Sequence, residues 1–241
     1  EPDRKTPTPT LCEIFKAWQL FLEAAADVKE ANGGVLIEPF RYDLVNLGRE
    51  LLAQLSVPLV LDFIDATKAK QLNASAVKST ADVYINLLLD ADTLVQTDSA
   101  FLLGPWIAMA RSLAATGEAD CGDKDCAAFY EWNARSQLTT WNPTPKGATK
   151  IPGGPIDYAG KHWSGLIRDY YGVRAGLLRD QALADAAAGK PLDNTAVDLL
   201  FAQHAYNWTN AENKYTEKVV GDAVEISQQM MDKYGHYYAS C

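Results

Sequence analysis

The sequence predicts an all-α protein: a single compact domain of about eight helices that pack antiparallel on one another. Apolar residues recur at helical spacing through most of the 241 residues. Strand signals amount to little more than residues 35–37 (VLI), and no internal repeat or domain boundary is visible. With 48% hydrophobic residues, a chain of this length can bury a substantial core.

The first two helices follow from their start and stop signals. Thr10 and Glu13 form a capping box, which predicts the first helical start, and residues 32–34 (NGG) predict the end of that helix. The second helical region is expected at about residues 42–72. Pro58 lies within it and is expected either to kink the helix or to open a new segment.

The next three helices have clearer periodicity. One apolar stripe predicts a helix over about residues 76–96. Asp98 is expected to cap the fourth helix, with Gly104-Pro105 in its first turn, and Gly117 to end it. A fifth helix is expected at about residues 126–141.

A long loop separates these helices from the rest of the chain. Residues 142–155 contain so many prolines and glycines that regular structure is excluded, and loops of this length within compact domains are often functional. The sixth helix is expected at about residues 156–188, ended by residues 189–191 (GKP). Two more helices are expected at about residues 195–208 and 217–238.

The net charge of the chain limits the classes of partner that it can bind. The formal net charge is −9 at pH 7. Nucleic acids and anionic membranes require a basic surface, so we expect neither as a partner. A neutral or cationic ligand fits an acidic protein better.

Four cysteines allow three pairings, and the sequence alone does not select one. Cys121 and Cys126 enclose a polar, turn-forming stretch (GDKD), which favours a disulfide between them. Cys12, on the first helix, and Cys241, the last residue, would then remain. They could tie the two ends of the chain together or reach a separate chain. A zinc site is disfavoured because the spacing is not that of a zinc motif.

Several features together indicate an extracytoplasmic protein. Asn73 and Asn207 begin N-glycosylation sequons (NAS and NWT), and the cysteines suit an oxidising compartment. Residues 1–10 resemble a linker or a processed N-terminus, which leaves residues 11–241 as the helical domain. We therefore expect a secreted protein, or one in the lysosomal or vacuolar lumen.

The sequence contains no complete catalytic constellation. The three histidines, His162, His204 and His236, lie far apart without the spacing of metal ligands or of a catalytic triad. A phosphate-binding loop and a nucleophile elbow are also absent from the sequence. We therefore expect no catalytic residue, no metal and no cofactor in this chain.

The aromatic residues are more informative. Trp132, Trp141, Tyr158 and Trp163 are expected to cluster around the long loop, as sugar-stacking side chains often do. Packing in the hydrophobic core is the alternative role for each of them.

At these residues the sequence resembles a known family, the α-N-acetylglucosaminidases, which are glycoside hydrolases. The resemblance is to the helical C-terminal region of these enzymes and covers nearly the whole chain. The matching segments follow in the same order, at residues 13–18 (EIFKAW), 40–49 (FRYDLVNLGR), 101–106 (FLLGPW), 129–141 (FYEWNARSQLTTW), 157–161 (DYAGK), 170–174 (YYGVR) and 221–225 (GDAVE).

The resemblance implies a role without catalysis. In that family a small N-terminal domain and a (β/α)₈ barrel precede the helical region, and both catalytic glutamates lie on the barrel. The helical domain closes one wall of the pocket for terminal N-acetylglucosamine. The matching positions are Trp141 and Tyr158, with Ile156 nearby. The interval between the two aromatics is longer here than in the family, so the apolar pocket position falls on Pro155 or Ile156.

Three basic residues, Arg135, Lys161 and Arg174, match polar positions of the family. The resemblance implies that they orient the loop and the helices.

Two functions remain open at this stage. The chain is either the helical domain or a processed chain of an α-N-acetylglucosaminidase, or a free-standing secreted binding module without hydrolase activity. In the first case its partners are the catalytic barrel, as a domain or a separate chain, and a glycan that ends in N-acetylglucosamine.

Overall fold

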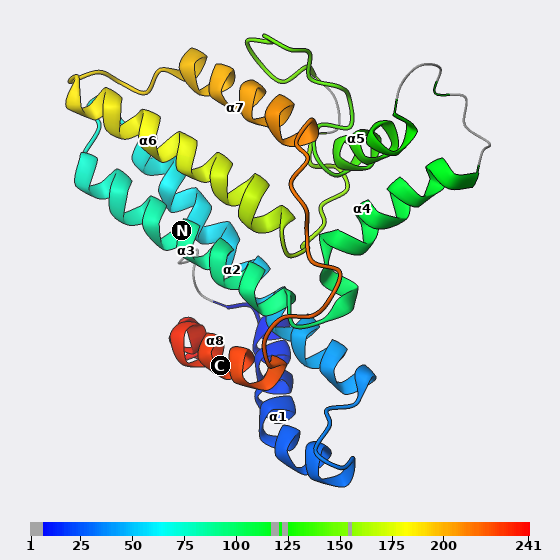
Figure 1. Cartoon of the computed structure of the whole chain (residues 1–241). Helices are drawn as coiled ribbons and strands as arrows, with labels where there is room; N and C mark the ends of the chain where they lie inside the picture. The colour runs from blue at the N-terminus through cyan, green and yellow to red at the C-terminus, as the bar shows by residue number, and fades with distance from the viewer. Residues whose placement is uncertain (1–6, 117–120, 122–124, 154–155) are drawn as a thin grey trace.

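A computed structural model describes residues 7–116, 121, 125–153 and 156–241, and within these ranges the protein is all-α, as predicted (Figure 1). The helices are α1 (Pro9–Ala31), α2 (Glu38–Thr67), α3 (Ala74–Val95), α4 (Leu103–Ser112), α5 (Cys126–Leu138), α6 (Val173–Ala187), α7 (Asn194–Thr209) and α8 (Ala223–Tyr234). Short 3₁₀ turns cover Ser99–Phe101, Leu113–Thr116 and Gly235–Tyr238, and a π-helix covers Ile167–Gly172. No strand occurs in the described ranges, where residues 35–37 are irregular and Leu102 and Ser164 form an isolated bridge.

The first helix begins earlier than its predicted capping box. Thr8, not Thr10, is the N-cap residue, and its hydroxyl accepts a hydrogen bond from the Leu11 amide at 3.3 Å. Pro9 occupies the first helical position, where its fixed φ favours the start of a helix. The expected linker therefore overlaps α1, and residues 1–6 of it lie outside the described part of the chain.

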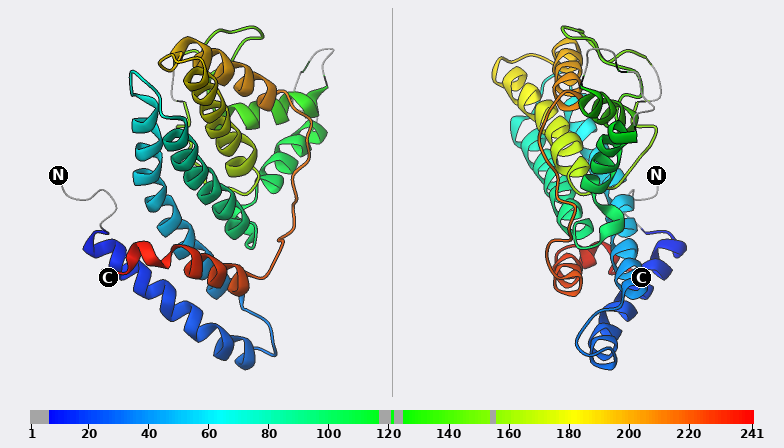
Figure 2. Two further views of the ribbon diagram at one scale, coloured as in Figure 1. Left: turned by 90° about the vertical axis from the view of Figure 1, so that its left-hand side faces the viewer. Right: turned by 45° about the vertical axis from the view of Figure 1, so that its right-hand side comes forward.

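Helices α2 and α3 form an antiparallel pair, and Figure 2 shows them side by side. Pro58 lies inside α2 and does not open a new segment. Asn73 caps α3 by accepting the Ala76 amide at 3.1 Å. Gly48 allows α1 to approach α2 closely, because a Cβ atom at this position would lie 2.7 Å from the ring of Trp18.

Helices α1 and α8 pack at one end of the molecule, shown at the bottom of Figure 1. Side chains of α1, α2, α3 and α8 fill the larger of the cores, including Phe15, Trp18, Leu44, Leu55, Leu94, Met230 and Tyr234. The last helix is shorter than predicted, because residues 210–222 form an extended linker. Gly221, at φ 90°, ends this linker, and Asp222 then caps α8.

A second core lies between α4, α5, α7 and the π-helix that precedes α6. Its buried members are Leu103, Ile107, Ala134, Leu138, Leu166, Tyr170, Ala205 and Trp208. Arg135 is fully buried beside it and binds the Glu131 carboxylate at 2.7 Å. Its guanidinium also lies over the Trp208 ring at 5.0 Å. This arginine ties α5 to the end of α7, in agreement with the structural role that the resemblance implied.

The sixth helix was predicted from about residue 156, but helical structure begins about ten residues later with the π-helix at Ile167, and α6 itself begins at Val173. Residues 156–165 form turns and extended segments, and Gly165 has φ 92°. Buried Asp92 of α3 stabilises the helical start, since its carboxylate accepts the Gly165 and Arg168 amides at 2.7 and 3.1 Å. The long-range bonds of Asp92 therefore override the helical periodicity of the preceding residues.

One described helix, α2, is long and apolar enough to pass a length-and-composition test for a membrane span. Its central residues, such as Leu51, Leu52 and Leu59, are buried in the core. Core helices of globular proteins pass the same test, so the hydropathy of α2 is explained by its packing.

Candidate functional site

The predicted pocket residues lie at the two ends of the long loop. Helix α5 ends at Leu138 because Thr139 leaves helical geometry, so Trp141 lies three residues beyond the helix instead of ending it. Trp141 has a left-handed backbone, at φ 58°, and its amide donates to the Ser136 carbonyl at 2.8 Å. This reversal turns the tryptophan out of the path of α5.

The other end of the loop is attached to the same point. The Asp157 amide donates to the Thr139 carbonyl at 2.6 Å, and Asp157 has φ 55°. Tyr158 therefore lies in a turn at residues 156–159 and does not start a helix, contrary to the prediction. Because this bond closes the loop at its base, Trp141 and Tyr158 are brought together.

The two rings meet edge to face. Their centroids are 5.9 Å apart at an interplanar angle of 75°, a favoured geometry for aromatic pairs. Trp141 is 47% exposed and Tyr158 is 75% exposed. Ile156, beside them, is 40% exposed, whereas Pro155 lies outside the described residues. These exposures exclude a core role for the pair in the described chain and leave an apolar surface available to a ligand or a partner.

An ion pair braces the turn that carries Tyr158. Arg174, in the first turn of α6, donates to Asp157 Oδ2 at 2.6 Å. The other oxygen, Oδ1, is buried and has no hydrogen-bond partner within the described part of the chain. Sequence reasoning identified Arg174 but missed Asp157. The adjoining Tyr158-Ala159-Gly160 was the available signal, since a polar residue before such a turn often caps or anchors it.

Arg174 is itself held by aromatic rings. Its guanidinium lies 5.2 Å from the Tyr170 centroid and 5.4 Å from the Tyr171 centroid, within the range of cation–π attraction. Burial raises the pKa of Tyr170 to about 12 and also raises the pKa of Tyr171. Both phenols are therefore neutral at physiological pH, and the Asp157 carboxylate is the charged partner of the arginine.

A small cavity lies next to this turn. It has a volume of about 230 Å³ and is lined by α2, α3 and the segment from Gly160 to Tyr171. At its edge, Arg49 Nη1 lies 2.8 Å from His162 Nδ1. Burial, and then the Arg49 charge, lower the pKa of His162, so this histidine is neutral near pH 7. The contact with Arg49 gives His162 a structural role at the edge of the cavity.

The other two predicted aromatics point elsewhere, so the expected cluster of four is wrong. Trp163 packs on Trp106, with centroids 5.9 Å apart, and Lys161 lies over Trp163 at 5.7 Å. Trp132 stacks on Phe129 along α5. Helical phase explains the difference: Trp132 faces outward from the middle of α5, whereas Trp141 lies beyond its end.

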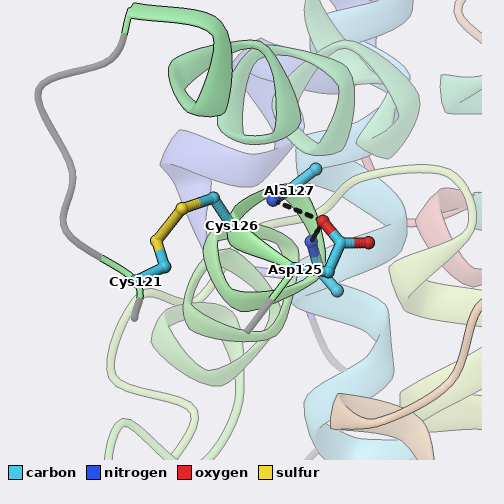
Figure 3. Close-up of a disulfide and its surroundings, with 5 residues drawn as sticks. Cys121, Asp125, Cys126 and Ala127 are labelled. Carbon is cyan, nitrogen blue, oxygen red and sulfur yellow. Dashed lines mark hydrogen bonds between the residues drawn. A yellow bond between two sulfur atoms is a disulfide. The ribbon is translucent and has the colours of Figure 1, made fainter. Parts of the chain in front are cut away.

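The cysteines form two disulfides. Cys121 pairs with Cys126, with a Cα–Cα distance of 5.4 Å, as their spacing favoured (Figure 3). Cys12 pairs with Cys241 at a Cα–Cα distance of 5.0 Å, which ties α1 to the last residue of the chain.

Both sequon asparagines are exposed. Asn73 precedes α3 as its cap, and Asn207 lies near the end of α7. Their positions leave room for a glycan, and modification at either one remains a prediction. Among the described residues, no group of three or more His, Cys, Asp or Glu side chains is placed to hold a metal ion.

Comparison with known proteins gives consistent matches. The family model of the alpha-N-acetylglucosaminidase C-terminal domain matches residues 9–233. The human alpha-N-acetylglucosaminidase is 31% identical over 222 residues, which cover 92% of this chain and 27% of the human protein.

Solved structures share the fold. A family 89 glycoside hydrolase from Clostridium perfringens, in complex with 2-acetamido-1,2-dideoxynojirmycin, superposes with a TM-score of 0.72 at 23% identity, covering 91% of this chain and 23% of that one. A Clostridium perfringens structure in complex with its substrate GlcNAc-alpha-1,4-galactose gives a TM-score of 0.70 at 23% identity, with coverage of 90% and 23%. The chain thus spans about a quarter of the length of the relatives it matches.

Proposed function

Because this chain belongs to the alpha-N-acetylglucosaminidase C-terminal domain family, we propose that it serves as the helical domain of a glycoside hydrolase that removes terminal α-linked N-acetylglucosamine. The family match over residues 9–233 carries this proposal. The chain supplies no catalytic residue and binds no cofactor. A retaining glycosidase needs two carboxyl groups about 5 Å apart across the scissile bond, and these belong to the (β/α)₈ barrel with which the domain associates.

Trp141 and Tyr158 form the contribution of this domain to the sugar pocket, with Ile156 beside them. Their exposure supports the assignment, since a core residue would be covered by the domain itself. The Arg174–Asp157 ion pair also supports this assignment, because aromatic rings that stack on a sugar contribute most when they are fixed before the ligand arrives. Arg174 and Asp157 provide this rigidity.

We further propose that the protein works in an oxidising compartment. Two disulfides and two exposed sequon asparagines suit a secreted or lumenal glycoprotein. We expect a secreted, lysosomal or vacuolar location, glycans on Asn73 and Asn207, and neither nucleic acid nor membrane as a partner.

Activity measurements test the proposal directly. The complete protein that contains this chain is expected to hydrolyse 4-nitrophenyl α-N-acetylglucosaminide, whereas the 241-residue chain alone is expected to show only the uncatalysed background. A full-length protein without turnover would favour the binding-module alternative. Turnover by the isolated chain, abolished by changing one of its own carboxylates, would contradict the proposed division of roles.

A further inference from the structure

One groove, whose lining includes neither Trp141 nor Tyr158, has no role in the proposed function. It lies between α4, α5 and the linker that follows α7, and its volume is about 860 Å³. A smaller hollow of about 460 Å³ adjoins it and shares Asp125, Trp132 and Asn210. A groove of this size falls within the range of small-molecule sites. Trp132, which the sequence singled out as a candidate sugar-stacking residue, lines both hollows.

The aromatic side chains of α5 form an exposed platform here. Phe129 and Trp132 are one helical turn apart, and their rings are nearly parallel, with centroids 6.0 Å apart and an interplanar angle of 27°. Phe129 is 44% exposed. Aromatic rings that remain exposed beside a cavity offer an apolar face to a ligand, and the C–H face of a pyranose ring fits such a face.

Polar groups stand around this platform. Asp125 caps α5 with one carboxylate oxygen, which accepts the Ala127 amide at 2.9 Å, and Figure 3 shows its other oxygen directed away from the helix. Arg111 and Glu131 form an ion pair across the groove at 2.7 Å. Asn210 adds a side-chain amide. An aromatic face with planar acid, amide and guanidinium groups around it matches the alternating C–H and hydroxyl surfaces of a sugar.

The wall opposite α5 is held in place by the core. Buried Arg135 donates to the Asn213 carbonyl at 2.7 Å and to the Trp208 carbonyl at 3.3 Å, which fixes the linker. Gly104 lets the linker cross α4, since a Cβ there would lie 2.1 Å from the Thr216 carbonyl oxygen. The groove is therefore formed before any ligand arrives, which reduces the entropic cost of binding.

The charged side chains that line the groove indicate whether it would bind a neutral or an anionic sugar. Its lining includes the acidic residues Asp125, Glu131, Glu212 and Glu217 and the basic residues Arg111 and Lys214. Two arginines neutralise Glu131, since Arg111 and buried Arg135 each bind its carboxylate at 2.7 Å. The remaining acidic excess disfavours sulfated or carboxylated sugars.

We infer that this groove is a second carbohydrate-binding site, which takes a neutral oligosaccharide and is separate from the Trp141–Tyr158 pair. The inference does not depend on the proposed function.

Nuclear magnetic resonance of the ¹⁵N-labelled 241-residue chain tests this inference. The indole N–H signal of Trp132 is assigned with Trp132→Phe and followed during titration with GlcNAc-α-1,4-galactose, triacetylchitotriose and mannotriose. At least one of these neutral probes is expected to shift the signal with a millimolar Kd, and a heparin disaccharide is expected not to do so. Absence of a saturable shift with all three at about 20 mM overturns the inference.

Variants separate this site from the proposed pocket wall. Trp132→Ala removes the indole signal, so its binding is followed through the backbone amide signals of Ala128 and Asn210, which also line the groove. This variant is expected to bind the responding probe at least about tenfold more weakly. Phe129→Ala, at a more exposed ring, is expected to weaken binding as well and provides the test if Trp132→Ala does not fold. Trp141→Ala is the matched control and is expected to leave this binding unchanged. Probe binding that is lost in Trp141→Ala but kept in both α5 variants overturns the inference without affecting the proposed function.

Discussion

At the scale of single residues, two residues of the candidate pocket have backbone conformations that cost free energy. Trp141 and Asp157 are the non-glycine residues with positive φ in the described chain. A non-glycine residue in this region costs on the order of 1–2 kcal/mol, and such residues cluster at functional sites. Asp157 donates its amide to the Thr139 carbonyl, and Trp141 lies two residues after Thr139. The backbone strain is therefore concentrated where the two aromatic side chains are exposed.

Changing Trp141 to alanine separates a binding role from a packing role. In the full-length enzyme, Trp141→Ala is expected to reduce kcat/KM by about 1–3 kcal/mol of transition-state stabilisation, because a stacking surface for the sugar is lost. The unfolding midpoint should change little, since the ring is half exposed. The buried Trp208→Ala serves as contrast and is expected to lose about 3–5 kcal/mol of stability. If Trp141→Ala is destabilised as strongly as Trp208→Ala, the pocket assignment is wrong.

Protonation of His162 provides a second residue-scale prediction. The pKa of His162 is lowered below its ordinary value of 6.5, first by burial and then by the Arg49 charge. Below pH 6.5 the unfolded chain therefore binds a proton that the folded chain resists. The stabilising contribution is complete above pH 6.5 and is lost as the pH falls towards the folded pKa.

Urea unfolding between pH 7 and pH 5 measures this effect. His162→Gln is expected to flatten the decline of the free energy of unfolding over this window. His236→Gln, at an exposed position, is the control and should retain the slope of the unaltered chain. An unchanged slope in His162→Gln would show that the histidine does not contribute.

At the scale of helices, two glycines in helix interiors have opposite surroundings. A Cβ at Gly48 of α2 would lie 2.7 Å from the Trp18 ring, whereas a Cβ at Gly176 of α6 would have no neighbour within 4 Å. Gly48→Ala is expected to destabilise the protein by about 1–3 kcal/mol through overpacking. Gly176→Ala should stabilise it by about 0.5–1 kcal/mol, the ordinary gain of helix propensity. Chemical denaturation of both variants decides the matter, and equal effects would contradict the close approach of α1 to α2.

Sequence periodicity predicted the existence of the helices much better than their ends. α3 and α7 begin and end within two residues of the prediction, because an aspartate or asparagine cap precedes a regular apolar stripe in each. The predicted sixth helix failed at its start. Bonds from Asp92, more than 70 residues away, fix residues 164–168, and no local pattern reveals them. The same is true of the Asp157 amide bond to Thr139, which decides where Trp141 and Tyr158 lie.

At the scale of the whole molecule, the described chain has three hydrophobic cores, and the two larger ones share the partly buried side chains of Trp163 and Tyr171. The core with α1 and α8 contains both ends of the described chain (Figure 1). The second core, with α4, α5 and α7, supports both the aromatic pair and the groove beside Trp132. The candidate binding surfaces thus belong to one half of the fold, and the disulfide between the chain ends belongs to the other.

The two disulfides should therefore contribute unequally to stability. Cys12 and Cys241 are separated by 229 residues, and Cys121 and Cys126 by five. A cross-link restricts the unfolded chain more when it closes a longer loop. Replacing Cys12 and Cys241 by serine is therefore expected to lower the free energy of unfolding by about 3–5 kcal/mol, and replacing Cys121 and Cys126 by about 2 kcal/mol.

Thermal unfolding without reductant measures the stability of both double variants, and peptide mapping of the unaltered chain verifies the pairing. Equal losses from the two double variants, or a Cys121 peptide linked to Cys12, would contradict the tie between the chain ends.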